Sequence, residues 1–144
     1  MKSSFVIYTD IYRILKDYPD KDIIIVYFSL ELSANTLLAK LLSLYLYETY
    51  GIEVTYMQLM SFTNKLPDDI HKYVIEAREW LESISHKFII YDKQLSADSF
   101  YAEMMELHKS LGTFQKSPDG KRTIYTPNNP NQIVNVVIDH LLLV

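Results

Sequence analysis

The chain has no cysteine, and only 3 glycines and 5 prolines occur among its 144 residues. The absence of cysteine excludes a disulfide framework and a thiolate metal site. The low glycine and proline content, together with 49% hydrophobic residues, excludes the disordered and fibrous classes. The length suffices for one compact domain with its own core.

An excess of positive charge is also missing. The formal net charge is -4, so the surface as a whole is not expected to bind DNA non-specifically. A nucleic-acid motor remains possible, because such motors can carry their DNA contacts on a few loops. No apolar run is long enough to span a membrane, and the chain does not open like a secretory signal. We therefore expect the cytoplasm of a cell, or of an infected host, and no membrane partner.

Three apolar runs predict strands, at residues 22–30, 87–91 and 132–138. The first, DIIIVYFSL, shows no alternation, which indicates a strand buried on both faces as in a parallel sheet. Helices are predicted at residues 4–18, 33–50, 67–85 and from about 96 to 111, with a short helix or turn at 53–60. This alternation predicts an α/β fold built on a parallel sheet with right-handed crossovers.

Local signals place the ends of the first two long helices. The first helix has an apolar stripe at spacings of three and four, formed by Phe5, Tyr8, Tyr12 and Leu15. Pro19 ends this helix. Ser33 is the expected N-cap of the next helix, and Gly51 is its expected stop.

Residues 112–130 differ in character from the rest of the chain. The turn sequence Pro118-Asp119-Gly120 is flanked by short β-prone segments, which predicts an inserted β-hairpin. Its cations Lys116, Lys121 and Arg122 could contact phosphate, but a solvated turn is the favoured interpretation.

Two acids follow apolar strands, Glu31 after the first and Asp139 after the last. Ligands of open parallel α/β sheets bind beyond the carboxyl ends of the strands. The two acids would share that edge if their strands are neighbours. An acid at such a position can also simply begin a loop. An apolar strand that ends in Asp is typical of the Walker B element, where the carboxylate helps to hold Mg²⁺ through water.

The start of the chain, Met1-Lys2-Ser3-Ser4, runs directly into a predicted helix. A P-loop has Gly-Lys-Ser/Thr at this place, so that the helix N-terminus and the Lys hold phosphates while the hydroxyl binds Mg²⁺. Here Met1 stands where the last glycine would be. Lys-Ser after an initiator Met is common, so the order of the later elements gives the hypothesis its weight.

Several segments resemble DnaB-type replicative helicases. Residues 27–34, YFSLELSA, resemble the F-S-L-E-M-S/P segment of that family, and Lys40-Leu41-Leu42 stands where the family has Arg-Leu-Leu. Residues 138–144, IDHLLLV, look like its D-Y-L-Q-L-M segment, and residues 126–130, TPNNP, are similar to a phage-encoded variant. The resemblance implies a partial RecA-like ATPase domain over residues 1–144, from the end of Walker A to Walker B, with a three-layer parallel sheet.

The resemblance also implies roles for single residues. Lys2, Ser3 and Ser4 would bind the nucleotide, with Lys2 on the β and γ phosphates and Ser3 as a Mg²⁺ ligand. Glu31 would be the catalytic acid that orients or deprotonates water, and Asp139 would be the Walker B acid that holds Mg²⁺ through water. The parent protein would couple hydrolysis of ATP with Mg²⁺ to translocation on single-stranded DNA as a homo-hexamer. Lys40 would support the Glu31 segment.

The sequence also departs from the family. The glycine-rich part of the P-loop is absent, and Leu142 stands where the family has a phosphate-sensing Gln. These departures predict a fragment that is itself inactive. Three alternatives stay open: another RecA-like ATPase, a catalytically dead helicase-like interaction module, and an unrelated α/β domain in which Lys2, Glu31 and Asp139 coincide by chance.

Overall fold

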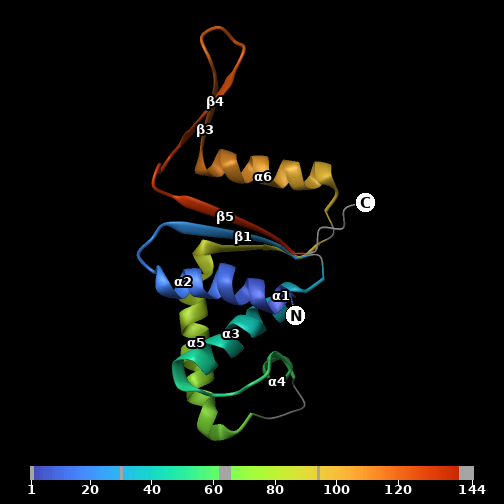
Figure 1. The fold of residues 1–144 in the computed structure, drawn as a ribbon, viewed down its shortest axis with the longest axis vertical. Coiled ribbons are helices and arrows are strands. Elements are labelled where there is room, and N and C mark those ends of the chain that lie inside the picture. Colours follow the sequence, from blue (N-terminus) through green and yellow to red (C-terminus); the bar gives the residue numbers. More distant parts are fainter. Residues whose placement is uncertain (1, 30, 62–65, 94, 140–144) are drawn as a thin grey trace. The chain divides into compact units, whose positions relative to one another are not determined.

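The chain folds as two compact units in a computed structural model. The structure describes residues 2–29, 31–61, 66–93 and 95–139, with only the backbone described for residues 2 and 3. Unit 1 contains residues 1–93 and 134–144, and unit 2 contains residues 94–133. A three-stranded parallel sheet and a separate antiparallel hairpin confirm the predicted mixed α/β class (Figure 1).

The sheet of unit 1 has the strand order β2-β1-β5. It comprises β1 (Ile23–Ser29), β2 (Phe88–Tyr91) and β5 (Ile133–Asp139). The central strand β1 is buried along almost its whole length, as its unbroken apolar run predicted. Tyr27 pairs with Ile90 and Phe28 with Tyr91 in the parallel ladder to β2. Strand β5 includes Asp139, which is therefore the last residue of a strand rather than the first of a loop.

The first helical stretch is interrupted by a π-helix. It runs through α1 (Lys2–Val6), the π-helix η1 (Ile7–Tyr12) and α2 (Arg13–Asp17). A π-helix contains about one residue more per turn than an α-helix, so it changes which residues share a face. The predicted stripe is therefore wrong at its start, since Phe5 is 69% exposed. The buried face consists of Ile7, Ile11, Tyr12 and Leu15.

The helix α3 (Ala34–Tyr50) begins and ends as the sequence predicted. The Ser33 hydroxyl accepts a hydrogen bond from the backbone N–H of Thr36 at 3.2 Å. Gly51 adopts a left-handed conformation, with φ of 67°, and its N–H donates to the carbonyl of Tyr47 at 2.8 Å. The remaining helices of unit 1 are α4 (Tyr56–Met60), α5 (Asp68–Ile84) and the 3₁₀-helix η2 (Ser85–Lys87).

The core of unit 1 lies between one face of the sheet and its helices. Odd-numbered residues of β1 pack there against the first helical stretch, α3 and the end of α5. Trp80 of α5 stacks on Tyr45 with ring centroids 4.7 Å apart and meets Tyr12 edge-on at 5.6 Å. A second cluster joins α3 to α5 around Leu46, Val54, Val74 and Ala77. No helix within the described ranges is both long and apolar enough to cross a membrane.

Unit 2 consists of one helix and one hairpin, and the hairpin confirms the prediction for residues 112–130. The elements are α6 (Ala97–Leu111), β3 (Gly112–Lys116) and β4 (Thr123–Pro127). Gly112 lies under the ring of Tyr125, and a Cβ at this position would lie 2.5 Å from that ring and from the carbonyl oxygen of Thr126. The backbone of Gly112 is extended, which any residue can adopt. Glycine is required here because of the close approach of Tyr125 and Thr126.

We expect Gly112→Ala to destabilise the hairpin by about 1–3 kcal/mol, because the methyl group must displace the Tyr125 ring or the backbone. Loss of cross-strand NMR contacts between Phe114 and Tyr125 measures the effect. Thr113→Ala, at an exposed neighbouring position, is the matched control and should change little. Equal stability of the two variants would contradict the packing described for Gly112.

Candidate functional site

The carboxyl edge of the parallel sheet brings three acids to one side of unit 1. Glu31 lies in the loop after β1, Asp92 directly follows β2, and Asp139 ends β5. The predicted condition for a shared site, that the strands carrying Glu31 and Asp139 are neighbours, is met by the order β2-β1-β5. This edge is where open parallel α/β sheets bind ligands.

A buried hydrogen bond joins the two strands at this edge. The Tyr27 hydroxyl donates to Oδ2 of Asp139 at 2.8 Å. Tyr27 is fully buried and Asp139 is 9% exposed. A buried hydroxyl without a hydrogen-bond partner would destabilise the fold, and this bond supplies the partner. The bond also fixes the orientation of the carboxylate.

The charges of both acids act on Tyr27. Burial raises the pKa of the Tyr27 hydroxyl well above its usual range, and the hydrogen bond to Asp139 raises this pKa further. The charges of Asp139 and Glu31 both add to the rise in pKa. The Tyr27 hydroxyl therefore stays protonated at neutral pH and acts as a donor to Asp139.

The loop that carries Glu31 is held at both ends. The Ser29 hydroxyl donates to the carbonyl of Leu32 at 2.6 Å and accepts from the N–H of Leu32 at 3.0 Å. Beyond the loop, the carboxylate of Asp92 accepts the N–H of Ala34, the first residue of α3, at 3.0 Å. An acid at a helix N-terminus is favoured by the unsatisfied N–H groups and the helix dipole. These contacts fix the backbone on either side of Glu31, whose side chain is exposed.

The predicted phosphate-binding residues lie at the start of α1. The helical stretch of residues 2–17 is about 24 Å long and β1 is about 23 Å long, so the helix returns along the full strand. Figure 1 shows α1 near the end of β1 and α2 near its start. The start of the helix, with Lys2 and Ser3, therefore lies towards the carboxyl edge of the sheet. The side chains of Lys2 and Ser3 lie outside the described part of the chain.

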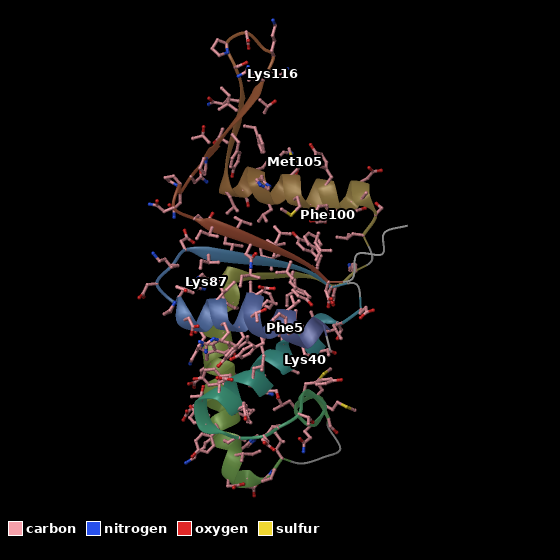
Figure 2. The ribbon with its side chains drawn as sticks, viewed as in Figure 1. Phe5, Lys40, Lys87, Phe100, Met105 and Lys116 are labelled. Atoms are coloured by element: carbon pink, nitrogen blue, oxygen red, sulfur yellow. The ribbon has the colours of Figure 1, made fainter. Side chains whose placement is uncertain are left out.

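Ser4 and Lys40 line the same small cavity, of about 200 Å³, between α1, α3 and α4. The Lys40 ammonium lies over the ring of Tyr56, 5.0 Å from its centroid, in a cation–π contact. Figure 2 shows Lys40 on α3 below the first helical stretch. The support of the Glu31 segment by Lys40 remains a prediction.

Three members of this edge were not singled out from the sequence: Tyr27, Ser29 and Asp92. Asp92 carries the same signal as Glu31, since it follows the apolar run KFIIY directly. Tyr27 and Ser29 lie inside an apolar strand, where no pattern distinguishes a polar contact from packing.

Within the described ranges, no three acidic or histidine side chains are grouped so that they could hold a metal ion by themselves. One carboxylate oxygen of Asp139 accepts the hydrogen bond from the Tyr27 hydroxyl, and an ionised carboxylate has about four acceptor positions in all. Mg²⁺ is usually bound by one or two carboxylates, often through water, together with substrate phosphates. The Asp139 carboxylate has the chemistry of a Mg²⁺ ligand, and Glu31 has the chemistry of an acid that can orient water.

No known family, no curated protein and no solved structure matches the chain.

We expect Tyr27→Phe to lower the free energy of unfolding at neutral pH by about 1–3 kcal/mol, because it removes a buried hydrogen bond to a charged group. The substitution should also change how the free energy of unfolding falls at alkaline pH. The pKa of Tyr27 is raised in the folded state, so its contribution is complete below pH of about 10 and is lost as the pH rises beyond that value. Denaturant titrations between neutral pH and about pH 11 should show a shallower alkaline decline for the variant.

Part of the alkaline decline should remain in Tyr27→Phe, since burial also raises the pKa of Tyr12 to about 12. Tyr101→Phe is the matched control, because that ring is 66% exposed. An alkaline profile unchanged by Tyr27→Phe would contradict the buried bond to Asp139.

We expect Asp92→Ala to loosen the start of α3 and to cost about 1 kcal/mol, as removal of a helix-capping acceptor does. Amide hydrogen exchange should accelerate at Ala34, whereas the amide of Thr36, held by Ser33, should change less. Glu53→Ala removes an exposed acid elsewhere in unit 1 and serves as the control. Equal exchange rates at Ala34 in both variants would refute the anchoring role of Asp92.

Proposed function

We propose that the chain forms part of a RecA-like P-loop ATPase domain of the DnaB helicase class. The observation that carries the proposal is the adjacency of β1 and β5, which places Glu31 and Asp139 on one edge, with Tyr27 under the influence of both. Adjacent strands are the condition that a site shared by the two acids requires.

The position of the first helix supports the same proposal. Its start points towards the edge that carries the acids, and the first backbone N–H groups of a helix attract phosphate. In this proposal Lys2 and Ser4 contact the nucleotide, Ser3 and Asp139 hold Mg²⁺, and Glu31 orients the attacking water. Catalysis of phosphoryl transfer depends largely on such positioning and on charge stabilisation.

The parent protein would be a homo-hexameric ring that translocates on single-stranded DNA with energy from ATP. The present chain would supply the Walker B side of the site and the start of the phosphate-binding helix. A P-loop also has a glycine-rich nest of backbone N–H groups, and Met1 stands here where its last glycine would be.

The test is the Mg²⁺-dependent binding of a fluorescent ATP analogue to two forms of the chain. One form is the sequence as given, and the other carries a glycine-rich P-loop segment ahead of Lys2. We expect binding only by the extended form, a loss of at least about tenfold with Lys2→Ala, and a loss of Mg²⁺ dependence with Asp139→Asn. Glu31→Gln should retain binding and lower any hydrolysis by about 10²-fold or more.

Lys21→Ala, an exposed substitution in the turn before β1, is the control for Lys2→Ala and should leave binding unchanged. If both forms are folded and neither binds nucleotide, a catalytically dead interaction module or an unrelated α/β domain becomes the better explanation. If the extended form binds and hydrolyses ATP without stimulation by single-stranded DNA, another RecA-like ATPase is favoured.

A further inference from the structure

The β3–β4 hairpin differs in charge from the rest of the chain. Residues 112–127 contain three cations and one acid, a net charge of +2, whereas the whole chain carries -4. Lys116, Lys121 and Arg122 are all exposed, and Figure 2 shows Lys116 towards the tip of the hairpin. The remaining residues together carry -6, so positive charge is concentrated on this one element of unit 2.

The single acid of the hairpin, Asp119, forms hydrogen bonds within the turn. Asp119 accepts hydrogen bonds from the Ser117 hydroxyl and, at 3.1 Å, from the N–H of Lys121. The Ser117 hydroxyl lowers the pKa of Asp119, with a further contribution from the Lys121 N–H, so this acid remains ionised while it shapes the turn. It offsets only one of the three cations.

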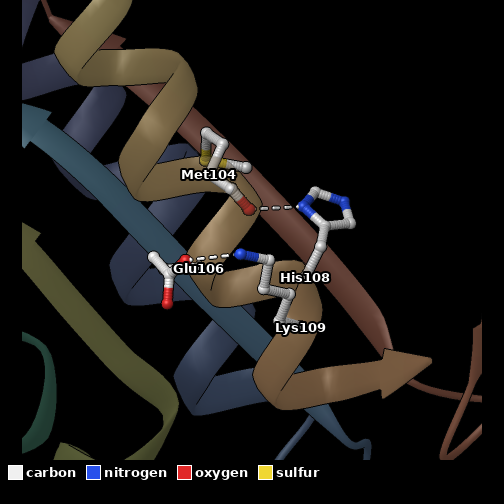
Figure 3. Close-up of polar contacts among 4 residues, drawn as sticks. All are labelled: Met104, Glu106, His108 and Lys109. Carbon is white, nitrogen blue, oxygen red and sulfur yellow. Dashed lines mark hydrogen bonds and ion pairs between the residues drawn. The ribbon is translucent and has the colours of Figure 1, made fainter. Parts of the chain in front are cut away.

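Lys109, near the end of α6, has its charge balanced by an acid, in contrast to the cations of the hairpin. Lys109 forms an ion pair with Glu106 at 2.8 Å, as Figure 3 shows. The same view shows His108, whose Nδ1 lies 2.7 Å from the carbonyl oxygen of Met104. The ion pairs found among the described residues involve none of Lys116, Lys121 and Arg122.

One face of the hairpin combines aromatic rings with the basic tip. Phe114 pairs with Tyr125 across the ladder, so both side chains lie on the same face, and Lys116 lies two residues further along that face. The two rings are half-buried with centroids 4.9 Å apart. The Tyr125 hydroxyl donates to the carbonyl of His108 at 3.1 Å, which holds this ring in place. A fixed ring pair beside exposed cations is the combination that binds single-stranded nucleic acid by base stacking and phosphate contacts.

We propose that the β3–β4 hairpin is a contact site for single-stranded DNA, in which Phe114 and Tyr125 stack on bases while Lys116, Lys121 and Arg122 contact phosphates. The choice of DNA as the physiological strand rests on the proposed function. The binding itself requires no nucleotide and uses a surface separate in sequence from Lys2, Glu31 and Asp139. An acidic protein or a duplex would use the cations but would have no use for the rings.

The experiment measures fluorescence anisotropy of a labelled oligo-dT of about 20 nucleotides with the full chain, without ATP or Mg²⁺, at two or more salt concentrations. The triple variant Lys116→Gln, Lys121→Gln, Arg122→Gln should weaken binding by at least about tenfold at low salt. It should also lower the slope of log affinity against log salt by about 2, since each phosphate contact on a single strand contributes about 0.7. Phe114→Leu keeps an apolar side chain without a ring and should weaken binding by about tenfold at every salt concentration.

The control is the triple variant Arg13→Gln, Lys21→Gln, Lys72→Gln, which removes the same charge from exposed positions of unit 1 and should retain binding. Equal losses in the two triple variants would overturn the proposal in favour of a general charge effect. Undiminished binding by Phe114→Leu, or equally tight binding of a duplex or of polyglutamate, would overturn the assignment to single strands. Failure of the ATP-analogue experiment with success here would leave the hairpin site intact and remove only the ATPase.

Discussion

The hydrogen bond from Tyr27 to Asp139 is the interaction on which the arrangement of unit 1 depends. A fully buried hydroxyl needs an acceptor, and a carboxylate that is 9% exposed needs a donor. Each group meets the need of the other because β5 lies beside β1. The bond therefore ties a residue far along the sequence to the central strand, and it does so at the edge where the loop after β1 begins.

Hydrogen bonds of the neighbouring residues fix the loop that carries Glu31 at that edge. Ser29 closes the loop from the strand side, and Asp92 anchors the start of α3 from the neighbouring strand. A binding or catalytic site in general needs side chains placed to within a fraction of an ångström. A short loop fixed at both ends on regular elements meets this requirement better than a long surface loop would.

Sequence patterns predicted the elements of both units well where a local signal existed. The unbroken apolar run of β1, the Ser33 cap, the Gly51 stop and the turn at Pro118-Asp119-Gly120 each act within a few residues, and each is present in the structure. Strand neighbours could not be derived from the sequence, because the pairing of β1 with β5 depends on residues more than a hundred positions apart. For the same reason Tyr27 was indistinguishable from a packing residue, whereas Asp92 could have been found by the rule that singled out Glu31.

The π-helix at Ile7–Tyr12 determines which way the residues before Ile7 face. The additional residue places Ile7 and Tyr12 together in the core, and it turns everything before Ile7 by about 100° relative to an uninterrupted α-helix. The way the side chains of Ser4 and Phe5 face is thus coupled to the way Tyr12 packs against Trp80. Removal of a single residue from this segment would restore a regular helix, and the helix could then keep either its buried face or the present facing of Ser4 and Phe5, but not both.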